Sequence, residues 1–205
     1  IVQWLHTLGL HVDGGTARAV GDAAATTTAQ LDMPSLLALA AALGWASGFR
    51  LYAVVFIVGG MGALGWLALP PGLQVLQSPL VLLVAGSLML VEFFADKVPW
   101  VDSAWDAVHA FIRVPGGALL AAGVFGADNA TMGVVAGLLG GSLAATSLAT
   151  KMTTRAAANT SPEPFSNWGL SFFEDGLVIA VVWLATQHPV AFGVALVVMV
   201  VVSVL

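Results

Sequence analysis

Long apolar segments dominate this chain, and very few charges separate them. Only six Lys or Arg and eleven Asp or Glu occur among 205 residues, so charged residues make up 8%. A soluble domain carries about 25% charged residues. Hydrophobic residues make up 59%, and the mean hydropathy is +0.97. Because a bilayer offers the backbone no water to bond, these features predict an all-α, polytopic transmembrane helix bundle.

The lengths of the apolar segments predict how often the chain crosses the membrane. They fall at 35–47, 51–69, 79–95, 115–126, 131–150, 169–186 and 189–205. A helix needs about 20 residues to cross about 30 Å of hydrocarbon. Segments 35–47 and 115–126 are shorter, so each is expected to be a half-helix or one end of a longer helix broken at Gly48–Arg50 or Pro115. We therefore expect five or six crossings and one or two half-helices.

The first 33 residues differ from the rest and are treated as an N-terminal segment ahead of a single transmembrane domain at 34–205. A helix over residues 1–12 would place on one face the apolar side chains of Ile1, Trp4, Leu5, Leu8 and Val12. Such a face is typical of an amphipathic helix at the membrane interface. Residues 13–33 are small and polar, and are expected to form a linker or a loosely packed helix. The start lacks the basic region of a signal peptide.

Charge placement predicts the topology. If 115–126, extended back to about Ala107, crosses the bilayer, then connections 96–114 and 151–168 lie on one face. That face holds Lys97, Arg113, Lys151 and Arg155, whereas the connections on the opposite face hold no Lys or Arg. Basic residues favour the cytoplasmic side, so both connections are predicted to be cytoplasmic.

Two polar clusters interrupt the apolar sequence. The first contains Glu92, Asp96, Lys97, Asp102, Asp106, His109 and Arg113. The second contains Arg155, Asn159, Glu163, Asn167, Glu174 and Asp175. Ionisable groups next to hydrocarbon are costly unless they are paired, hydrated or bound to a ligand. Both clusters are therefore candidate binding or transport sites, and no catalytic residue is assigned.

The first cluster contains a polar stripe on a predicted helix that starts near Pro99. Its members, at spacings of four, three and four, are Asp102, Asp106, His109 and Arg113. The rest of the helix is apolar and aromatic, which is typical of an amphipathic helix lying at the membrane surface. Local pairing along the helix and with its dipole is the alternative explanation of the stripe.

Glu92 and Asp96 share one helical face, because they are four residues apart. Two carboxylates so close are not both ionised without a proton, a cation or a basic partner. Lys97 points about 100° away from Asp96 on an ideal helix, so Arg50 or Arg113 is the better candidate partner. Glu174 and Asp175 are likewise close together and need a proton, a cation or a basic partner. A buried ion-pair network and a proton or cation pathway both remain open.

Oxygen and amide groups in the two clusters suggest further sites. Turn-forming residues fill the connection from Asn159 through Glu163 to Asn167, which is either a capping loop or part of a polar site beside the first cluster. No cofactor is identified, but a divalent cation could bind an all-oxygen site made by Glu92, Asp96, Asp102 and Asp106. The chain has no cysteine, and its net charge of −5 offers no nucleic-acid surface.

A stripe of small residues predicts close helix packing. Its members, spaced by four, are Gly133, Gly137, Gly141, Ala145 and Ala149. Such stripes let another helix approach closely. The expected partners are membrane lipids together with a helix of the same chain, another membrane protein, or a second copy bound through Gly133, Gly137 and Gly141.

Two long motifs resemble the signatures of a known family. They are EFFADKVPWVDSAWDAVHAFIRVPGGA at 92–118 and RAAANTSPEPFSN at 155–167, the latter followed by Ser171 and Glu174–Asp175. Both are similar to those of the family called domain of unknown function 4126, over about residues 36–186. The resemblance implies a multi-pass protein of the bacterial inner membrane. The family has an Asn within a Gly-x-Asn-x-Tyr-like stretch, whereas this chain has Arg50 between Gly48 and Tyr52.

Three functions are compatible with these observations. The first is a small-solute or ion transporter or channel, in which Glu92, Asp96, Glu174 and Asp175 are proton- or cation-linked carboxylates and Arg50, Arg113 and Arg155 are counter-charges. The second is a non-catalytic accessory or scaffold subunit of a membrane complex, in which the charges only pair. The third is an enzyme acting on lipid headgroups with a carboxylate-bound metal. A dry, fully paired cluster without a cavity would argue against transport.

Overall fold

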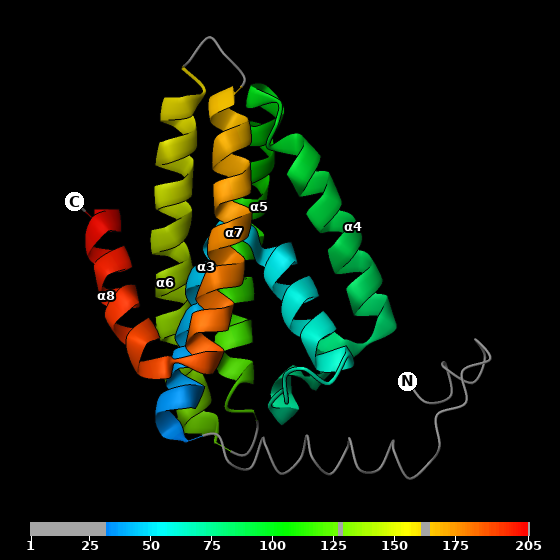
Figure 1. The fold of residues 1–205 in the computed structure, drawn as a ribbon, viewed down its shortest axis with the longest axis vertical. Helices are drawn as coiled ribbons and strands as arrows, with labels where there is room; N and C mark the ends of the chain where they lie inside the picture. The colour runs from blue at the N-terminus through cyan, green and yellow to red at the C-terminus, as the bar shows by residue number, and fades with distance from the viewer. Residues whose placement is uncertain (1–31, 127–128, 161–164, 205) are drawn as a thin grey trace, which may run out of the picture.

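The computed structural model describes residues 32–126, 129–160 and 165–204. These residues form helices and their connections: α3 (Met33–Ala63), the 3₁₀ helix η1 (Pro71–Gln77), α4 (Pro79–Ala95), α5 (Pro99–Gly123), α6 (Ala130–Ala158), α7 (Phe165–Gln187) and α8 (Pro189–Val204) (Figure 1). The all-α prediction is confirmed. The amphipathic helix predicted at 1–12 and nearly all of the linker after it lie outside the described residues.

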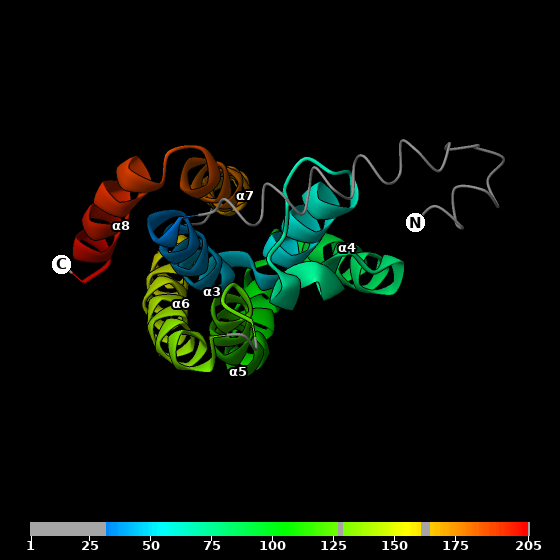
Figure 2. The same ribbon diagram turned by 90° about the horizontal axis from the view of Figure 1, so that it is seen from below.

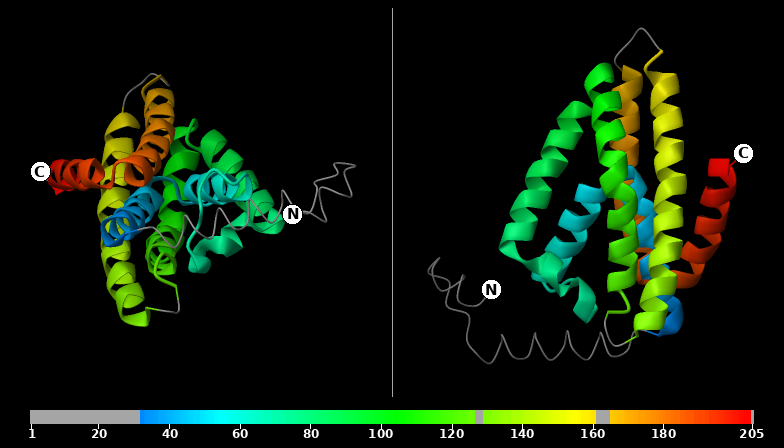
Figure 3. Two further views of the ribbon diagram at one scale, coloured as in Figure 1. Left: turned by 60° about the horizontal axis from the view of Figure 1, so that its bottom comes forward. Right: turned by 180° about the vertical axis from the view of Figure 1, so that it is seen from behind.

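Helix α3 is broken at Arg50 and forms two arms. Its start is capped by Asp32, whose side chain accepts a hydrogen bond of 3.0 Å from the backbone N–H of Ser35. Arg50 leaves the helical conformation, with φ −148° and ψ 78°. Both ends of α3 lie low in Figure 1 and the break lies higher, and the reverse view in Figure 3 agrees. The break predicted at Gly48–Arg50 is confirmed.

The second arm of α3 corrects the prediction of a crossing at 51–69. This arm ends at Ala63, and a turn with positive φ at Gly65 follows. At 1.5 Å per residue the arm is roughly 20 Å long, which is less than the hydrocarbon thickness of about 30 Å. It returns toward the side on which α3 starts (Figure 1). The apolar composition of 51–69 reflects burial of part of this arm in the bundle, as at Val54 and Val58, as well as apolar side chains on its outer surface, such as Phe56.

Helix α5 contains the other short segment, 115–126. It is one helix from Pro99 to Gly123, and Pro115 lies inside it without ending it. The predicted break at Pro115 is therefore wrong, and the alternative of a longer helix holds. Proline removes one backbone hydrogen bond from a helix interior. Pro115 is on the exposed side of α5, where no other helix has to pack against the distortion.

Glycines let the helices approach closely. A Cβ at Gly137 would lie 3.4 Å from the Ala118 carbonyl, so the predicted small-residue stripe of α6 packs on α5. A Cβ at Gly44 would lie only 2.5 Å from the Cα of Gly140, so only glycine fits where α3 crosses α6. A helix of the same chain therefore contacts the stripe. Association of two chains through Gly133, Gly137 and Gly141 stays a prediction.

Helix α3 is the centre of the bundle and contacts each of the other described helices. Seen from below, α3 lies between α6 and α7, and α8 lies at the edge (Figure 2). Buried positions fill its first arm, whereas α8 buries only Phe192. Helix α4 likewise exposes large apolar side chains such as Leu83, at 67%. Apolar outer faces of this kind are expected where helices contact lipid.

Among the described residues, three helices are long and apolar enough by composition to cross a membrane, namely α6, α7 and, if it is counted across its break, α3. The pair η1 and α4, bent by 69°, would make four. This is fewer than the five or six crossings predicted. Helix α5 carries Asp102, Asp106 and Arg113, and α8 has only 16 residues. These candidate spans indicate a membrane location.

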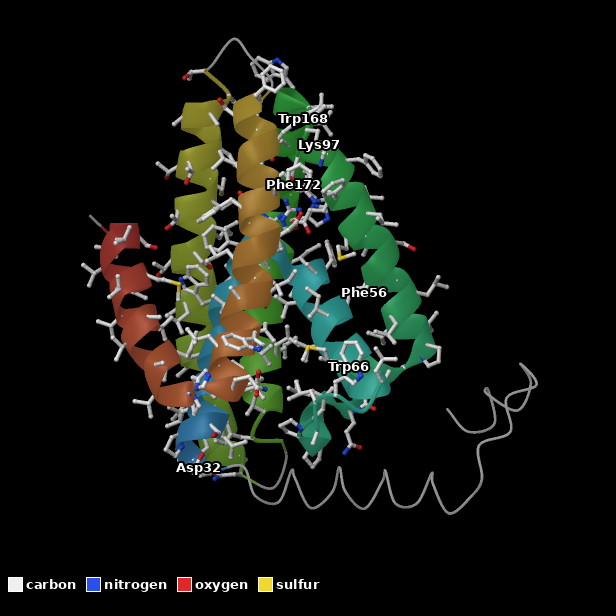
Figure 4. All side chains as sticks on the ribbon, viewed as in Figure 1. Asp32, Phe56, Trp66, Lys97, Trp168 and Phe172 are labelled. Carbon is white, nitrogen blue, oxygen red and sulfur yellow. The ribbon has the colours of Figure 1, made fainter. Side chains whose placement is uncertain are left out.

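The two connections predicted to share one face lie at the same end of the bundle. Lys97 and Trp168 mark that end in Figure 4, and Asp32 and Trp66 lie toward the other. However, Arg113, Lys151 and Arg155 are buried in helices rather than lying in connections. Within the described ranges only Lys97 is a basic residue in a connection. The number of basic residues in the connections therefore supports the predicted topology less strongly than expected. The cytoplasmic placement of both connections stays a prediction.

Candidate functional site

Ten charged side chains meet inside the bundle and form what we call the charge cluster. Its carboxylates are Glu92, Asp96, Asp102, Asp106, Glu174 and Asp175, and its cations are Arg50, Arg113, Lys151 and Arg155. Nine of the ten residues are at most 3% exposed, and the Asp175 side chain is 28% exposed. Members of the two polar clusters of the sequence, one ending at Arg113 and the other beginning at Arg155, thus form one site.

The break in α3 places Arg50 against three carboxylates. Its Nη2 lies 2.5 Å from Asp96 Oδ2 and 3.5 Å from Glu174 Oε2, and its Nε lies 2.9 Å from Asp175 Oδ1. Nη2 also donates to the hydroxyl of Ser171 at 2.9 Å. A guanidinium with donors on several sides suits this arrangement. Arg50 therefore joins the broken helix to α7 and to the connection between α4 and α5.

The backbone carbonyl just before the break in α3 accepts a hydrogen bond from a side chain of another helix. Phe49 O, next to the non-helical Arg50, accepts a hydrogen bond of 3.2 Å from Lys151 Nζ on α6. On the same face of α6, Ser147 Oγ donates to Trp45 O at 2.6 Å. A non-helical backbone at membrane depth requires such partners. Helix α6 thus stabilises the break from one side.

Arg113 is the partner of Glu92. Its Nη2 forms an ion pair with Glu92 Oε1, and its Nη1 donates to Asp106 Oδ1 at 2.7 Å. The prediction named Arg50 or Arg113, rather than Lys97, as the partner, and both pair here: Arg113 with Glu92 and Arg50 with Asp96. The spacing of two helical turns between Asp106 and Arg113 puts both on one face of α5.

Lys97 lies beside the charge cluster and forms none of its ion pairs. Its Nζ donates to Phe93 O at 2.9 Å and lies 3.0 Å from the centre of the Phe93 ring. Burial against these groups and, secondly, the charge of Arg50 lower the pKa of Lys97. The residue next to Asp96 in sequence is therefore not its main counter-charge.

Lys151 lies at the centre of the charge cluster. Its Nζ is within 4 Å of four carboxylates: Asp106 at 3.1 Å, Glu174 at 3.6 Å, Glu92 at 3.7 Å and Asp96 at 3.9 Å. A flexible ammonium can face several acceptors at once. It thus connects the carboxylates of α4, α5 and α7.

Arg155 forms the most complete set of hydrogen bonds. Its Nε and Nη2 donate to the two oxygens of Glu174, both at 2.9 Å. It also donates to Asp96 O at 3.0 Å and to Asp96 Oδ2 at 3.1 Å, and lies 3.6 Å from Asp102 Oδ1. Such two-pronged pairs are among the strongest ionic hydrogen bonds. Arg155 therefore holds α6, α7 and the end of α4 together.

Sequence reasoning missed Lys151 and Ser171 as members of this site. The available signal for Lys151 was its spacing of four from Arg155, which places both on one face of α6. Ser171 appeared only as part of the family-like motif. It bonds Arg50 through its hydroxyl, and its carbonyl accepts a second bond of 3.2 Å.

The two asparagines of the second motif lie at the rim of the charge cluster. Asn159 Nδ2 donates to Ser103 Oγ at 3.1 Å and lies 3.4 Å from Asp102 Oδ2. Asn167 Nδ2 donates to Asn159 Oδ1 at 2.8 Å. The structure therefore brings both asparagines beside the first cluster, which is one of the two alternatives left open by the sequence. Glu163 lies outside the described residues.

The polar stripe of α5 faces inward, not toward water. Asp102, Asp106, His109 and Arg113 are between 0% and 9% exposed. The opposite face carries Phe111, which is 85% exposed. The prediction of an amphipathic helix on the membrane surface is therefore wrong for this segment. Amphipathicity shows that a helix has a polar side, and here the partners of that side are Arg155, Lys151 and Glu92 rather than water.

Three acids lie close enough to share a metal ion, but cations already occupy their surroundings. Oxygens of Asp96, Asp102 and Asp106 lie within 4.8 Å of one another. Each also faces a basic group: Arg50 at 2.5 Å from Asp96, Arg155 at 3.6 Å from Asp102 and Lys151 at 3.1 Å from Asp106. A divalent ion there would meet strong repulsion. The donors fit side-chain cations better than the divalent cation considered from the sequence.

Carboxylates outnumber cations in the charge cluster. Among the described residues six acids face four bases, which leaves two negative charges without a counter-charge. Glu92 Oε2 and Asp102 Oδ1 are buried without a hydrogen-bond partner. Burial by itself would raise the pKa of Asp96, in the connection between α4 and α5, but Lys151, Arg50 and Arg155 lower it overall. With Asp96 ionised, the excess charge falls on the remaining acids.

These features define a class: a helical protein with candidate membrane spans that enclose a buried, acid-rich charge cluster. The chain belongs to the family described as domain of unknown function (DUF4126), which matches residues 37–205. This confirms the resemblance carried by the two motifs. Comparison with curated proteins and with solved structures gives no match.

Proposed function

We propose that this protein is a proton-linked membrane transporter for a small solute or ion. The observation that carries the proposal is the excess of carboxylates: six buried or half-buried acids share four cations. Two uncompensated negative charges in a low-dielectric interior are costly, and protons relieve that cost. A cluster of this composition is expected to hold protons near neutral pH and to release them when a water path reaches it.

The broken helix supplies an element that can move. Arg50 sits at the break of α3 and contacts Asp96, Glu174 and Asp175. Discontinuous helices carry the coupling sites of many transporters, because their arms can shift around a fixed site. A shift of either arm would separate Arg50 from these carboxylates and raise their proton affinity. Proton uptake would thereby be linked to the position of α3.

In this proposal α4, α5, α6 and α7 cross a bacterial inner membrane, and α8 would add a fifth crossing. In the same proposal, the first arm of α3 enters the membrane and the second arm returns to the side from which the first arm entered. The charges of α5 are compatible with a crossing, because their partners lie inside the bundle. The end marked by Lys97 and Asn159 would face the cytoplasm.

Two measurements test the proposal. Infrared spectra of the purified chain are expected to show a protonated carboxyl band at neutral pH that weakens in Asp102→Asn. In proteoliposomes holding a pH dye, a membrane potential is expected to drive proton flux that Asp102→Asn largely abolishes. Asp102 suits this test because its contacts, at 3.4 and 3.6 Å, are looser than those of Glu174.

The matched control is Asp32→Asn, which neutralises an exposed carboxylate far from the charge cluster and keeps a capping side chain. It should leave both the band and the flux unchanged. Proton flux no greater than that of empty vesicles would refute proton movement through the charge cluster. An absent carboxyl band would refute proton storage in the cluster.

A structural role is the second candidate, since each buried member of the charge cluster has an oppositely charged group within 4.0 Å. An accessory subunit whose charges only pair would keep its fold and its partners when matched pairs are made neutral. It would show no flux. The same vesicle assay therefore separates the two candidates.

A further inference from the structure

We infer that a lateral pocket beside the charge cluster binds lipophilic organic cations. The pocket has a volume of about 350 Å³ and lies between the second arm of α3, α4 and α7. Apolar residues line it, including Phe56, Met89, Phe93 and Ile179. In the described part of the chain, the one charged residue of its lining is Asp175. An apolar space with a single carboxylate suits a molecule with an apolar body and one positive charge.

The arrangement of the pocket walls favours entry of a ligand from the outer apolar surface of the helices. Phe93 of α4 and Phe172 of α7 meet edge to face, with ring centres 5.8 Å apart, between the pocket and the Lys97 end of the bundle. Figure 4 shows Lys97 and Phe172 together near that end, and Phe56 lower on α3. Two lining residues, Leu90 and Ile179, are 55% and 54% exposed. A ligand would therefore enter between α4 and α7 from the outer apolar surface.

The charge around the pocket favours a cation. Asp175 is the cluster member with the most exposed side chain, at 28%, and its Oδ1 is 2.9 Å from Arg50 Nε. Arg50 is not a full counter-charge for it, because the same guanidinium also faces Asp96 and Glu174. The next basic group, Lys97, is held by the carbonyl and ring of Phe93.

An aromatic ring adds to this preference. Phe56 lines the pocket, and the face of such a ring attracts cations, whereas the Phe93 ring already has the Lys97 ammonium against it. The position of Phe56 is set by packing: a Cβ at Gly86 would lie 2.9 Å from the Phe56 ring, so a glycine of α4 makes room for it. An uncharged lipid chain would gain the apolar contacts of the pocket but nothing from Asp175. The inference that the pocket binds such cations does not depend on the proposed transport function. The further step, that the bound cation is the transported solute, rests on that proposed function.

Equilibrium binding to the full chain in lipid nanodiscs tests the inference. The probes are a phenylalkyl trimethylammonium and its uncharged tert-butyl isostere, which has the same shape. Wild-type protein is expected to bind the cation about tenfold more tightly, a difference of about 1.4 kcal/mol. Asp175→Asn should remove this preference, and Asp175→Glu should restore most of it. Asp32→Asn, the matched loss of a distant carboxylate, should not change it.

A second variant keeps the test independent of the charge cluster. Ile179→Trp adds bulk at the pocket rim and should weaken binding of the cation, whereas Val194→Trp, on the exposed face of α8, should not. Equal affinity for both probes in wild-type protein would overturn the inference and show a pocket for apolar chains only. A preference that survives Asp175→Asn would overturn it as well. Because binding is measured without flux, its failure is distinct from failure of transport.

Discussion

Removal of the Arg155 guanidinium should be among the most destabilising single changes in the charge cluster. Arg155 is 2% exposed and donates two hydrogen bonds to Glu174 and two to Asp96. Arg155→Met keeps much of the side-chain length and removes every donor. Glu174 would then keep only Arg50 at 3.5 Å and Lys151 at 3.6 Å. A buried carboxylate would thus lose its closest partner, and the acid excess of the cluster would rise.

The expected cost follows from that loss. Removing one partner of a buried ion pair costs about 3–5 kcal/mol, because the other charge stays buried. Replacing both partners by apolar side chains is often close to neutral. Arg155→Met combined with Glu174→Met should therefore be more stable than Arg155→Met alone. The matched control is Lys97→Met, which loses a cation–π contact and one hydrogen bond but no ion pair of the charge cluster, at a cost of about 0.5–2 kcal/mol.

Denaturant unfolding of the detergent-solubilised chain, followed by tryptophan fluorescence, measures these differences. The chain has seven tryptophans to report on it. The expected order of stability is wild type, Lys97→Met, the double variant and, least stable, Arg155→Met. If Arg155→Met costs no more than Lys97→Met, the pairing in the charge cluster contributes little. If the double variant costs the sum of its two single changes, Arg155 and Glu174 are not coupled.

Three further predictions concern two helical glycines and the cap of α3. Gly44→Ala should destabilise the chain in the same unfolding assay, because its Cβ would lie 2.5 Å from the Cα of Gly140. Gly176→Ala, a helical glycine with no atom within 4 Å of its Cβ, should instead stabilise it by about 0.5–1 kcal/mol. Hydrogen bonds from Ser35 lower the pKa of Asp32 below its ordinary 3.8. The cap therefore stabilises α3 fully above that value and is lost as the pH falls through the lower folded pKa. Amide exchange at the start of α3 should accelerate at acid pH in wild type but not in Asp32→Asn.

Much of the fold follows from features that are local in sequence. Apolar segments of known length predicted the helices, and the sequence around Gly48–Arg50 predicted a break. The direction of the chain after that break was not predictable, because partners on other helices determine it. Lys151 bonds the Phe49 carbonyl, and Asp96 and Asp175 bind the Arg50 side chain. An apolar stretch from 51 to 69 reads the same whether it crosses the bilayer or returns beside α4.

The charge cluster shows the same division between local and long-range information. The spacing of four between Glu92 and Asp96 predicted a need for basic partners, and Arg113 and Arg50 meet it. Which other charges belong to the cluster depends on side-chain directions that spacing does not determine. Lys97, adjacent to Asp96, bonds the Phe93 carbonyl instead.

The set of residues that belong to the charge cluster determines its excess of negative charge. If Lys97 were paired inside, the cluster would carry one negative charge in excess, and a single proton would balance it. With Lys97 outside, two carboxylates of the six lack a counter-charge. Two sites of proton uptake in one coupled group would titrate in two separate steps that belong to the pair, since loss of the first proton raises the affinity of the group for the remaining one. The direction of one lysine side chain therefore sets whether the charge cluster lacks one counter-charge or two, and Lys97→Met should leave the proposed proton exchange intact.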